Sequence, residues 1–175
     1  MTRHKRNATM FYEHIESPIG PIVLAGNGEA VQWVGLPESR HPLTIPDEWT
    51  RNSKPFVEAK RQLDAYFAGE LTDFDLPLLP HGTEFQQRVW KALCTIPYAT
   101  TISYAELARR VGNPKASRAV GLANAANPLS IIVPCHRVIG ANGSLTGYGG
   151  GLPAKQHLLD LERRHAPRER FTLSS

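Results

Sequence analysis

Short apolar runs separated by turn-forming residues occupy the first part of the chain. The runs at 11–15, 22–25 and 30–36 are divided by proline, glycine and asparagine at 17–21 and 26–28. Punctuation of this kind between apolar runs is typical of strands joined by tight turns. We therefore expect a small antiparallel meander of three strands.

The pattern then changes from loop to helix. Residues 39–53 are polar and contain proline, which predicts a loop. Between 55 and 68 apolar residues recur at helical spacing, and Gly69 follows as a stop. This predicts one helix beside the meander, followed by a proline-bearing linker at 73–82.

Beyond the linker the spacing is that of amphipathic helices. Thr83 can cap a helix whose apolar stripe consists of Phe85, Val89 and Leu93 and which Pro97 closes. These side chains are expected to face the core and not a partner.

Two short helices joined by a break are expected next. Ser103 and Glu106 have the spacing of a capping box, which opens a helix. The sequence Gly-Asn-Pro at 112–114 ends it, and a second helix is predicted over 115–126. Two short helices joined by a tight turn suggest a helix-turn-helix.

A last helix is expected to begin near Pro153 and to end near Arg163. A carboxylate on its apolar face would need a buried partner, whereas at the rim of that face it would pair with a surface cation such as Arg163. Four residues share that face: Lys155, Leu158, Leu159 and Glu162.

These elements predict an α/β fold of the α+β type in two domains. Residues 1–80 form a small antiparallel sheet with a helix, and the basic head at 1–8 is expected to be disordered. Residues 81–175 form a mainly helical domain that contains the helix-turn-helix.

Composition and charge divide the chain further. The 175 residues are 41% hydrophobic, without an apolar run of membrane-spanning length or a signal-peptide segment, so we expect a cytoplasmic protein with no membrane partner. Residues 1–80 carry 8 Lys and Arg against 11 Asp and Glu, whereas residues 81–175 carry 12 against 5. The basic half suggests DNA as a partner, although on charge alone an ordinary basic surface explains it equally well.

Candidate chemistry lies at Cys135 and His136, directly after an apolar run. The thiolate is the nucleophilic form of cysteine, and a neighbouring base favours it. On an extended segment the two side chains would point to opposite faces, so a bridging water or a turn is needed. Taken alone, such a pair is more often a buried structural cysteine. Cys94 and Cys135 predict neither a disulfide framework nor a metal site.

The segment around this pair resembles the active-site signature of the O6-alkylguanine-DNA alkyltransferases. Residues 127–138 read NPLSIIVPCHRV, and the second proline, the cysteine, the histidine, the arginine and the last valine stand where that family has them. The resemblance covers residues 82–162. It extends more weakly through an N-terminal half similar to the family's smaller, variable domain, and implies a bacterial-type member without an N-terminal zinc domain.

The resemblance implies four catalytic residues. Cys135 is the nucleophile, and Glu162 orients His136 so that thiol, water, imidazole and carboxylate form a relay of the triad type. Tyr104 stands beside an extruded base and donates a proton to the purine as the alkyl group leaves. By its position alone, Tyr104 is a half-buried residue of an amphipathic helix.

The second helix of the pair is implied to bind the minor groove of double-stranded DNA, largely independently of sequence. Its small residues offer few donors to base edges, although they also suit packing against the core. The resemblance puts Arg118 in the space of the extruded nucleotide; the alternative is a phosphate contact. The residues expected to bind DNA are Arg118, Ala119, Ala123, Asn127 and Arg137, and Asn127 also braces the turn before the nucleophile.

The glycine-rich segment 146–151 resembles the family's substrate loop. By itself it is a flexible loop, and it lacks the lysine of a phosphate-binding Walker loop. The resemblance implies that the Gly149 amide lies near the guanine O6 and that the carbonyls of Cys135 and Val138 read the exocyclic amine. The residues expected to line the pocket are Val138, Tyr148, Gly149 and Gly150.

Together these features predict repair of O6-alkylguanine, and of O4-alkylthymine, by one irreversible transfer to Cys135 without a cofactor. We expect a monomer in solution; cooperative binding along DNA stays open. The preferred alkyl size is open too, because Ser130 stands where some members have a second proline. One rival is a non-enzymatic damage sensor of the same fold, whose members lack the cysteine. The other is a cysteine hydrolase, which would not explain the alanine-rich helix.

Overall fold

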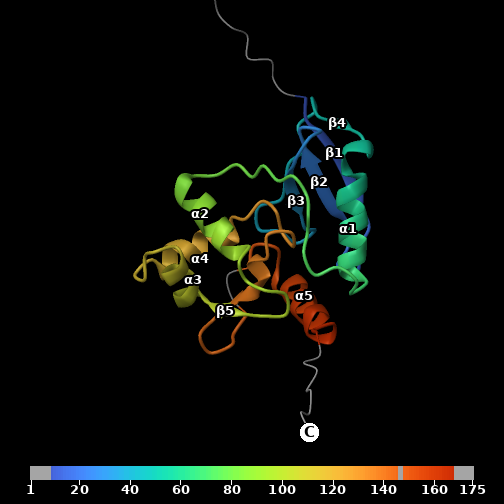
Figure 1. The fold of residues 1–175 in the computed structure, drawn as a ribbon. Helices are drawn as coiled ribbons and strands as arrows, with labels where there is room; N and C mark the ends of the chain where they lie inside the picture. The colour runs from blue at the N-terminus through green and yellow to red at the C-terminus, as the bar shows by residue number, and fades with distance from the viewer. Residues whose placement is uncertain (1–8, 146–147, 168–175) are drawn as a thin grey trace, which may run out of the picture.

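The protein is described here from a computed structural model covering residues 9–145 and 148–167 (Figure 1). The predicted disordered head at 1–8 and two residues of the predicted substrate loop lie outside the described residues. Among the described helices, none has the length and apolar character needed to cross a membrane.

The N-terminal half contains the predicted antiparallel meander. Strands β1 (Phe11–Ile15), β2 (Ile22–Gly26) and β3 (Val31–Gly35) pair in succession. A fourth strand, β4 (Thr50–Arg51), pairs parallel to β1 and gives the order β3-β2-β1-β4. The sequence predicted only a loop at 39–53, because a strand of two residues is too short to show periodicity.

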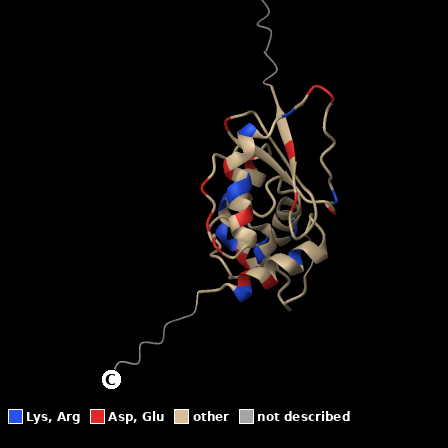
Figure 2. Cartoon of the chain, turned by 90° about the vertical axis from the view of Figure 1, so that its right-hand side faces the viewer, with Lys and Arg blue, Asp and Glu red and all other residues tan. Residues whose placement is uncertain are grey.

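Helix α1 (Val57–Phe67), preceded by a 3-10 turn at Lys54–Phe56, lies along the sheet (Figure 1). Its buried side includes Leu63 and Tyr66, which are fully inaccessible to solvent. Lysines, arginines and acids alternate along its outer side (Figure 2), where Lys60 pairs with Asp64. The charged side faces water and the apolar side covers the sheet, as the helical spacing predicted.

The C-terminal half is mainly helical. A complete capping box of Thr83 and Gln86 opens the first of its helices. Only half of the box predicted at Ser103 and Glu106 is present: the Ser103 hydroxyl accepts the Glu106 amide, while the Glu106 side chain binds neighbouring arginines. The helices are α2 (Glu84–Leu93), α3 (Tyr104–Arg110), α4 (Ser117–Ala125) and α5 (Leu152–Arg164).

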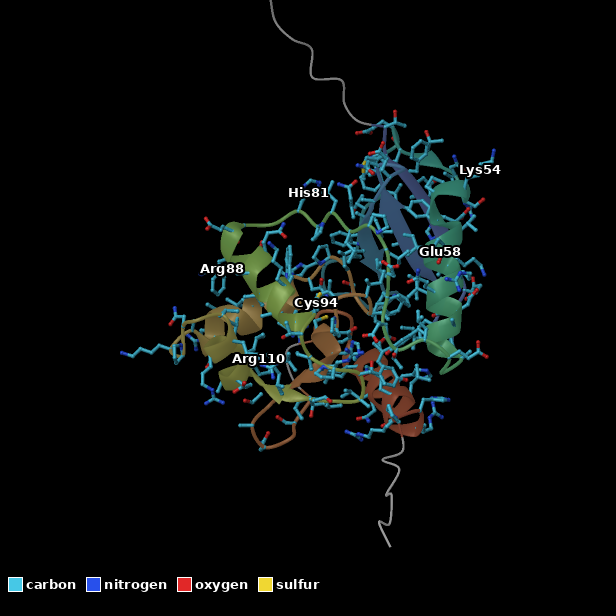
Figure 3. The ribbon with its side chains drawn as sticks, in the orientation of Figure 1. Lys54, Glu58, His81, Arg88, Cys94 and Arg110 are labelled. Atoms are coloured by element: carbon cyan, nitrogen blue, oxygen red, sulfur yellow. The ribbon has the colours of Figure 1, made fainter. Side chains whose placement is uncertain are left out.

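The predicted linker is hydrogen-bonded to β3. The Val31 amide donates to the Pro77 carbonyl and the Leu79 amide donates to the Val31 carbonyl, both at 2.9 Å. Farther along the linker, His81 (labelled in Figure 3) lies 2.6 Å from the Gln32 side-chain nitrogen. One hydrophobic core runs through both halves of the chain, so the sheet supports the C-terminal site directly.

Candidate active site

The segment after α4 is a tightly wound, buried turn. The Val34 amide of β3 donates to the Pro128 carbonyl at 2.8 Å, which attaches the segment to the sheet. Every residue from 128 to 138 is buried. Ile131 has a φ of 74°, a left-handed conformation that is rare for a β-branched residue. The packing therefore holds this backbone in a strained path.

Cys135 and His136 lie on a short 3-10 helix, Cys135–Arg137, and not on an extended strand. The turn considered as one way to bring the two side chains together is thus present. The following residues form β6 (Val138–Ile139), which pairs parallel with β5 (Ile102–Ser103). Neither two-residue strand was predicted, since neither produces a sequence pattern.

Two asparagines hold the Cys135 residue. The Asn127 side-chain nitrogen donates to the Val133 carbonyl at 2.9 Å and to the Cys135 sulfur at 3.1 Å, and its oxygen accepts the Leu129 amide. The bracing position predicted for Asn127 agrees with these bonds. The Asn124 side chain, which the sequence analysis missed, donates to the Cys135 carbonyl at 3.3 Å.

The Cys135 thiol is not ionised at rest. Burial raises the pKa of Cys135 to about 11, although the Asn127 hydrogen bond and the Lys155 charge act in the opposite direction. Its side chain is only 2% exposed, which is the physical cause. At neutral pH the thiol therefore keeps its proton, and a nucleophilic sulfur requires a base that removes the proton during the reaction.

His136 is placed to be that base. Its Nε2 atom lies 2.6 Å from the Glu162 Oε2 atom, and both side chains are buried. Because a carboxylate only accepts, Nε2 carries the hydrogen and Nδ1 keeps a free lone pair. The Nδ1 atom is buried and has no hydrogen-bond partner among the described residues. Burial lowers the pKa of His136, despite the opposing influence of Glu162, so the imidazole is neutral at pH 7.

Glu162 receives hydrogen bonds from several directions. Arg137 donates to it through Nε at 2.8 Å and through a terminal nitrogen at 3.2 Å, and the Ala99 amide donates at 3.0 Å. Burial would raise the pKa of Glu162, but the hydrogen bonds from His136 and Arg137 outweigh it and hold the pKa below its usual range. The carboxylate is therefore ionised, and the surface-pair alternative with Arg163 is wrong.

Two of the predicted DNA-binding residues point inward. Arg137 is 6% exposed and binds Glu162 and the Ile96 carbonyl, and Ala123 is 3% exposed. Neither side chain is on the surface of this structure, so the predicted contacts of Arg137 and Ala123 with DNA stay a prediction. In the case of Arg137 the cause of its burial is the buried carboxylate, which requires a cation beside it.

Lys155 is a buried cation that the sequence analysis placed on the α5 stripe without giving it a role. Its ammonium donates to the Val138 carbonyl at 2.6 Å and lies 5.9 Å from the centre of the Tyr148 ring. Burial lowers the pKa of Lys155 to about 8, so it stays largely charged at neutral pH. A positive charge near Cys135 favours the thiolate.

The outer face of α4 carries the remaining predicted DNA contacts. Arg118 and Ala119 are exposed, and no ion-pair partner of Arg118 is found within the described part of the chain. One turn later Leu122 is 69% exposed, a feature that the sequence analysis missed. Tyr104 opens α3, and its ring faces Gly121 of α4.

The predicted pocket residues are buried, and Tyr148 among them is near enough to Cys135 for their charges to interact. Val138, Tyr148, Gly149 and Gly150 are all buried. A Cβ atom on Gly149 would lie 2.3 Å from the Ala125 carbonyl oxygen, so this close approach requires glycine. Both carbonyls that are expected to read the guanine amine already accept hydrogen bonds: that of Cys135 from Asn124 and the Val138 amide, and that of Val138 from Lys155.

Two family models match the chain. The 6-O-methylguanine DNA methyltransferase, ribonuclease-like domain, matches residues 10–80, and the DNA binding domain of the same family matches residues 84–164. The chain belongs to this family. The family predicted from residues 127–138 is thus confirmed.

Relatives and solved structures agree with this family. The chain is 59% identical over 153 residues to the methylated-DNA–protein-cysteine methyltransferase of Methanosarcina acetivorans, covering 87% of this chain and 98% of that protein. It is 56% identical over 156 residues to the Mycobacterium tuberculosis protein of the same name, covering 89% and 94%. A crystal structure of Mycobacterium tuberculosis OGT in complex with DNA matches with a TM-score of 0.83 at 56% identity, covering 90% of this chain and 96% of that one. These matches confirm the predicted α/β fold and enzyme class.

Proposed function

We propose that this protein repairs O6-alkylguanine, and O4-alkylthymine, in double-stranded DNA by moving the alkyl group to its own Cys135. The observation that carries the proposal is the buried Nδ1 atom of His136, which has no hydrogen-bond partner among the described residues, on the residue that follows Cys135, whose thiol is protonated. A base whose other nitrogen is held by a carboxylate is the arrangement used to activate a hydroxyl or thiol nucleophile. The names of the relatives, which describe methyl transfer from DNA to a protein cysteine, support the same reaction.

The reaction balances without a cofactor. His136 Nδ1 takes the Cys135 proton through one water, and the sulfur attacks the alkyl carbon in line. A sulfur–carbon bond forms as the carbon–O6 bond breaks, and the electron pair of the broken bond stays on the guanine. Tyr104 donates a proton to the departing purine, and its phenolate is reprotonated through solvent by the proton that the His136 imidazolium releases, so the thiol proton is accounted for. Since the product is a thioether, which has no acyl centre for water to attack, the cysteine is not regenerated.

The exposed face of α4 is proposed to lie in the minor groove. Small side chains permit close approach of the helix backbone, and sequence readout is not needed by a protein that must find damage anywhere. Arg118 would fill the space of the extruded nucleotide. Leu122, exposed one turn farther along the same helix, would give an apolar contact of the kind that minor-groove proteins insert between bases.

The extruded base needs access to a thiol that is buried in this structure. Cys135 and Tyr148 are 2% and 1% exposed, so we propose that the neighbouring side chains move when a base enters. The Cys135 and Val138 carbonyls would read the guanine amine, in competition with the protein donors that they already accept. We further propose that the protein acts as a monomer in the cytoplasm, where a reducing environment keeps the thiol usable.

Mass spectrometry after incubation with excess radiolabelled methylated duplex tests the proposal. We expect about one alkyl group per molecule, located on Cys135. The Cys135→Ser variant should lose transfer while keeping DNA affinity. Cys94→Ser, which changes the exposed cysteine directly after α2 (Figure 3), should transfer normally. Label released as a small molecule, with repeated turnover, would favour the hydrolase; binding without any transfer would favour the sensor.

A further inference from the structure

A tyrosine from the N-terminal half reaches the catalytic carboxylate. Tyr66 lies in the last turn of α1, and its hydroxyl donates to the Glu162 Oε2 atom at 2.6 Å. This is the same oxygen that lies 2.6 Å from His136 Nε2. The Tyr66 side chain is completely buried. The first half of the chain therefore contributes a hydrogen bond to the group that holds the base.

The Tyr66 hydroxyl remains a donor throughout the working pH range. Burial, followed by the charge of Glu162, raises the pKa of Tyr66 well above its usual value. A carboxylate oxygen that accepts a hydroxyl hydrogen bond gives less electron density to its other donors. The hydroxyl thus weakens the pull of Oε2 on the His136 proton while it fixes the orientation of the carboxylate.

We propose that Tyr66 is a positioning residue of the transfer reaction, which acts through Glu162 to keep His136 neutral with Nδ1 free to accept the Cys135 proton. The inference rests on the proposed function, because it assigns Tyr66 a part in that same proton transfer. It also gives the N-terminal half a role in the chemistry besides its packing against the C-terminal half.

Several charged groups besides the Tyr66–Glu162 hydrogen bond influence the pKa of His136, and Tyr66→Phe leaves all of them in place. Glu162 and Lys155 face it from α5, and Arg137 and Cys135 adjoin it on the 3-10 helix. Burial lowers the pKa of His136, and Glu162 opposes this effect. Loss of the Tyr66 hydroxyl makes Oε2 a stronger acceptor, so it should raise the pKa of His136.

Tyr98 offers a matched control in the same aromatic cluster. Its ring packs edge-on against that of Tyr66, with centroids 6.3 Å apart, and the Arg137 guanidinium lies over the Tyr98 ring. Within the described residues its hydroxyl has no hydrogen-bond partner. Tyr98→Phe therefore removes a hydroxyl from the cluster without removing a bond to Glu162.

Single-turnover alkyl transfer from methylated duplex should be measured as a function of pH for the full chain, Tyr66→Phe and Tyr98→Phe. We expect the midpoint of the acid limb, where His136 loses its proton, to move upward by about 0.5 to 1 pH unit in Tyr66→Phe. Tyr98→Phe should keep the wild-type midpoint. The single variant Glu162→Gln and the double variant Glu162→Gln with Tyr66→Phe should have the same midpoint, since without the carboxylate the Tyr66 hydroxyl cannot influence His136.

A structural role alone would lower the melting temperature and the plateau rate of Tyr66→Phe without moving the midpoint, and that result would overturn the inference. An equal shift in Tyr98→Phe would overturn it as well, because the effect would then belong to the aromatic cluster. Peptide mapping of the alkylated wild type separates the two proposals: a label on Cys135 with an unmoved midpoint defeats only the role of Tyr66, whereas a label elsewhere defeats the proposed function.

Discussion

The His136 imidazole and the Glu162 carboxylate meet at 2.6 Å in a site where neither side chain is more than 1% exposed. Their contact fixes the imidazole tautomer, since the Nε2 hydrogen must point at the carboxylate. It leaves Nδ1 as the only basic lone pair of the ring. The position of one acid in α5 thus determines which nitrogen of His136 can take a proton.

Glu162→Gln should slow alkyl transfer by about 10-fold or more, because a neutral amide cannot stabilise the imidazolium that forms. With a weaker base, the rate should depend on direct ionisation of Cys135 and continue to rise toward its pKa of about 11. Single-turnover rates across pH provide the measurement. A wild-type pH profile would mean that Glu162 supports only the packing.

The same substitution leaves Arg137 buried without its carboxylate. Removal of one partner from a buried ion pair costs about 3–5 kcal/mol, so Glu162→Gln should also unfold more easily. The double variant Glu162→Gln with Arg137→Gln removes both charges and is the matched control. We expect it to recover part of the unfolding free energy without recovering the transfer rate.

The sequence predicted the elements whose patterns are local. The three strands of the meander are short apolar runs bounded by turn residues, and α1 and α2 have apolar residues at helical spacing. Each of these patterns lies within the element's own residues and can be read from the sequence. The Glu162 contact to His136 agrees with the relay that the resemblance implied, although that resemblance, and not the helix pattern, supplied the partner. Strands β4, β5 and β6 were not predicted, because a strand of two residues is too short to show an alternation of polar and apolar residues.

The missed site residues depend on contacts between distant parts of the chain. Tyr66 belongs to the apolar side of α1, and nothing in that helix indicates a carboxylate 96 residues later. Arg137 was expected to bind DNA from the family resemblance, and the signature segment 134–138 gives no sign that its partner is Glu162, 25 residues later. Lys155 did leave a signal: a lysine on the same stripe as Leu158 and Glu162 indicates a buried cation.

Lys155→Met should raise the pKa of Cys135 further, because it removes the one charge in α5 that favours the thiolate. Alkylation of the free protein by iodoacetamide should then require higher pH, and transfer from DNA at neutral pH should slow. Lys91→Met changes an exposed lysine of α2 and should leave both properties unchanged. A wild-type labelling profile for Lys155→Met would refute the role of its charge, and slower transfer beside it would point to the lost bond to the Val138 carbonyl.

Arg118→Ala separates extrusion of the base from chemistry at the sulfur. An arginine that occupies the stack helps only when a base must leave it, so transfer from duplex DNA should slow while reaction with the free base O6-benzylguanine should change little. Arg88→Ala, at an exposed arginine of α2 (Figure 3), is the control for loss of positive charge. Equal slowing on both substrates would refute the intercalating role. If Arg118 only contacts a phosphate, Arg118→Ala should instead reduce the slope of log binding constant against log salt concentration by about one.

Two glycines near the site should respond in opposite directions to alanine. At Gly149 the new Cβ atom would lie 2.3 Å from the Ala125 carbonyl oxygen. This oxygen belongs to the backbone of α4 and cannot move away by a side-chain rotation. Overpacking of this kind costs about 1–3 kcal/mol of unfolding free energy and should displace Tyr148 from the thiol, so transfer should fall as well. Gly121 lies inside α4, where the Cβ atom would meet the Tyr104 ring at 3.7 Å, an ordinary contact.

Gly121→Ala should therefore stabilise the protein by about 0.5–1 kcal/mol, the usual gain from replacing glycine within a helix. Denaturant unfolding of both variants gives the two free energies, and single-turnover transfer shows whether the site survives. If Gly149→Ala unfolds like the wild type and transfers at the wild-type rate, the loop does not need the close approach to the end of α4. A destabilised Gly121→Ala would mean instead that Tyr104 packs against α4 too tightly to admit a methyl group.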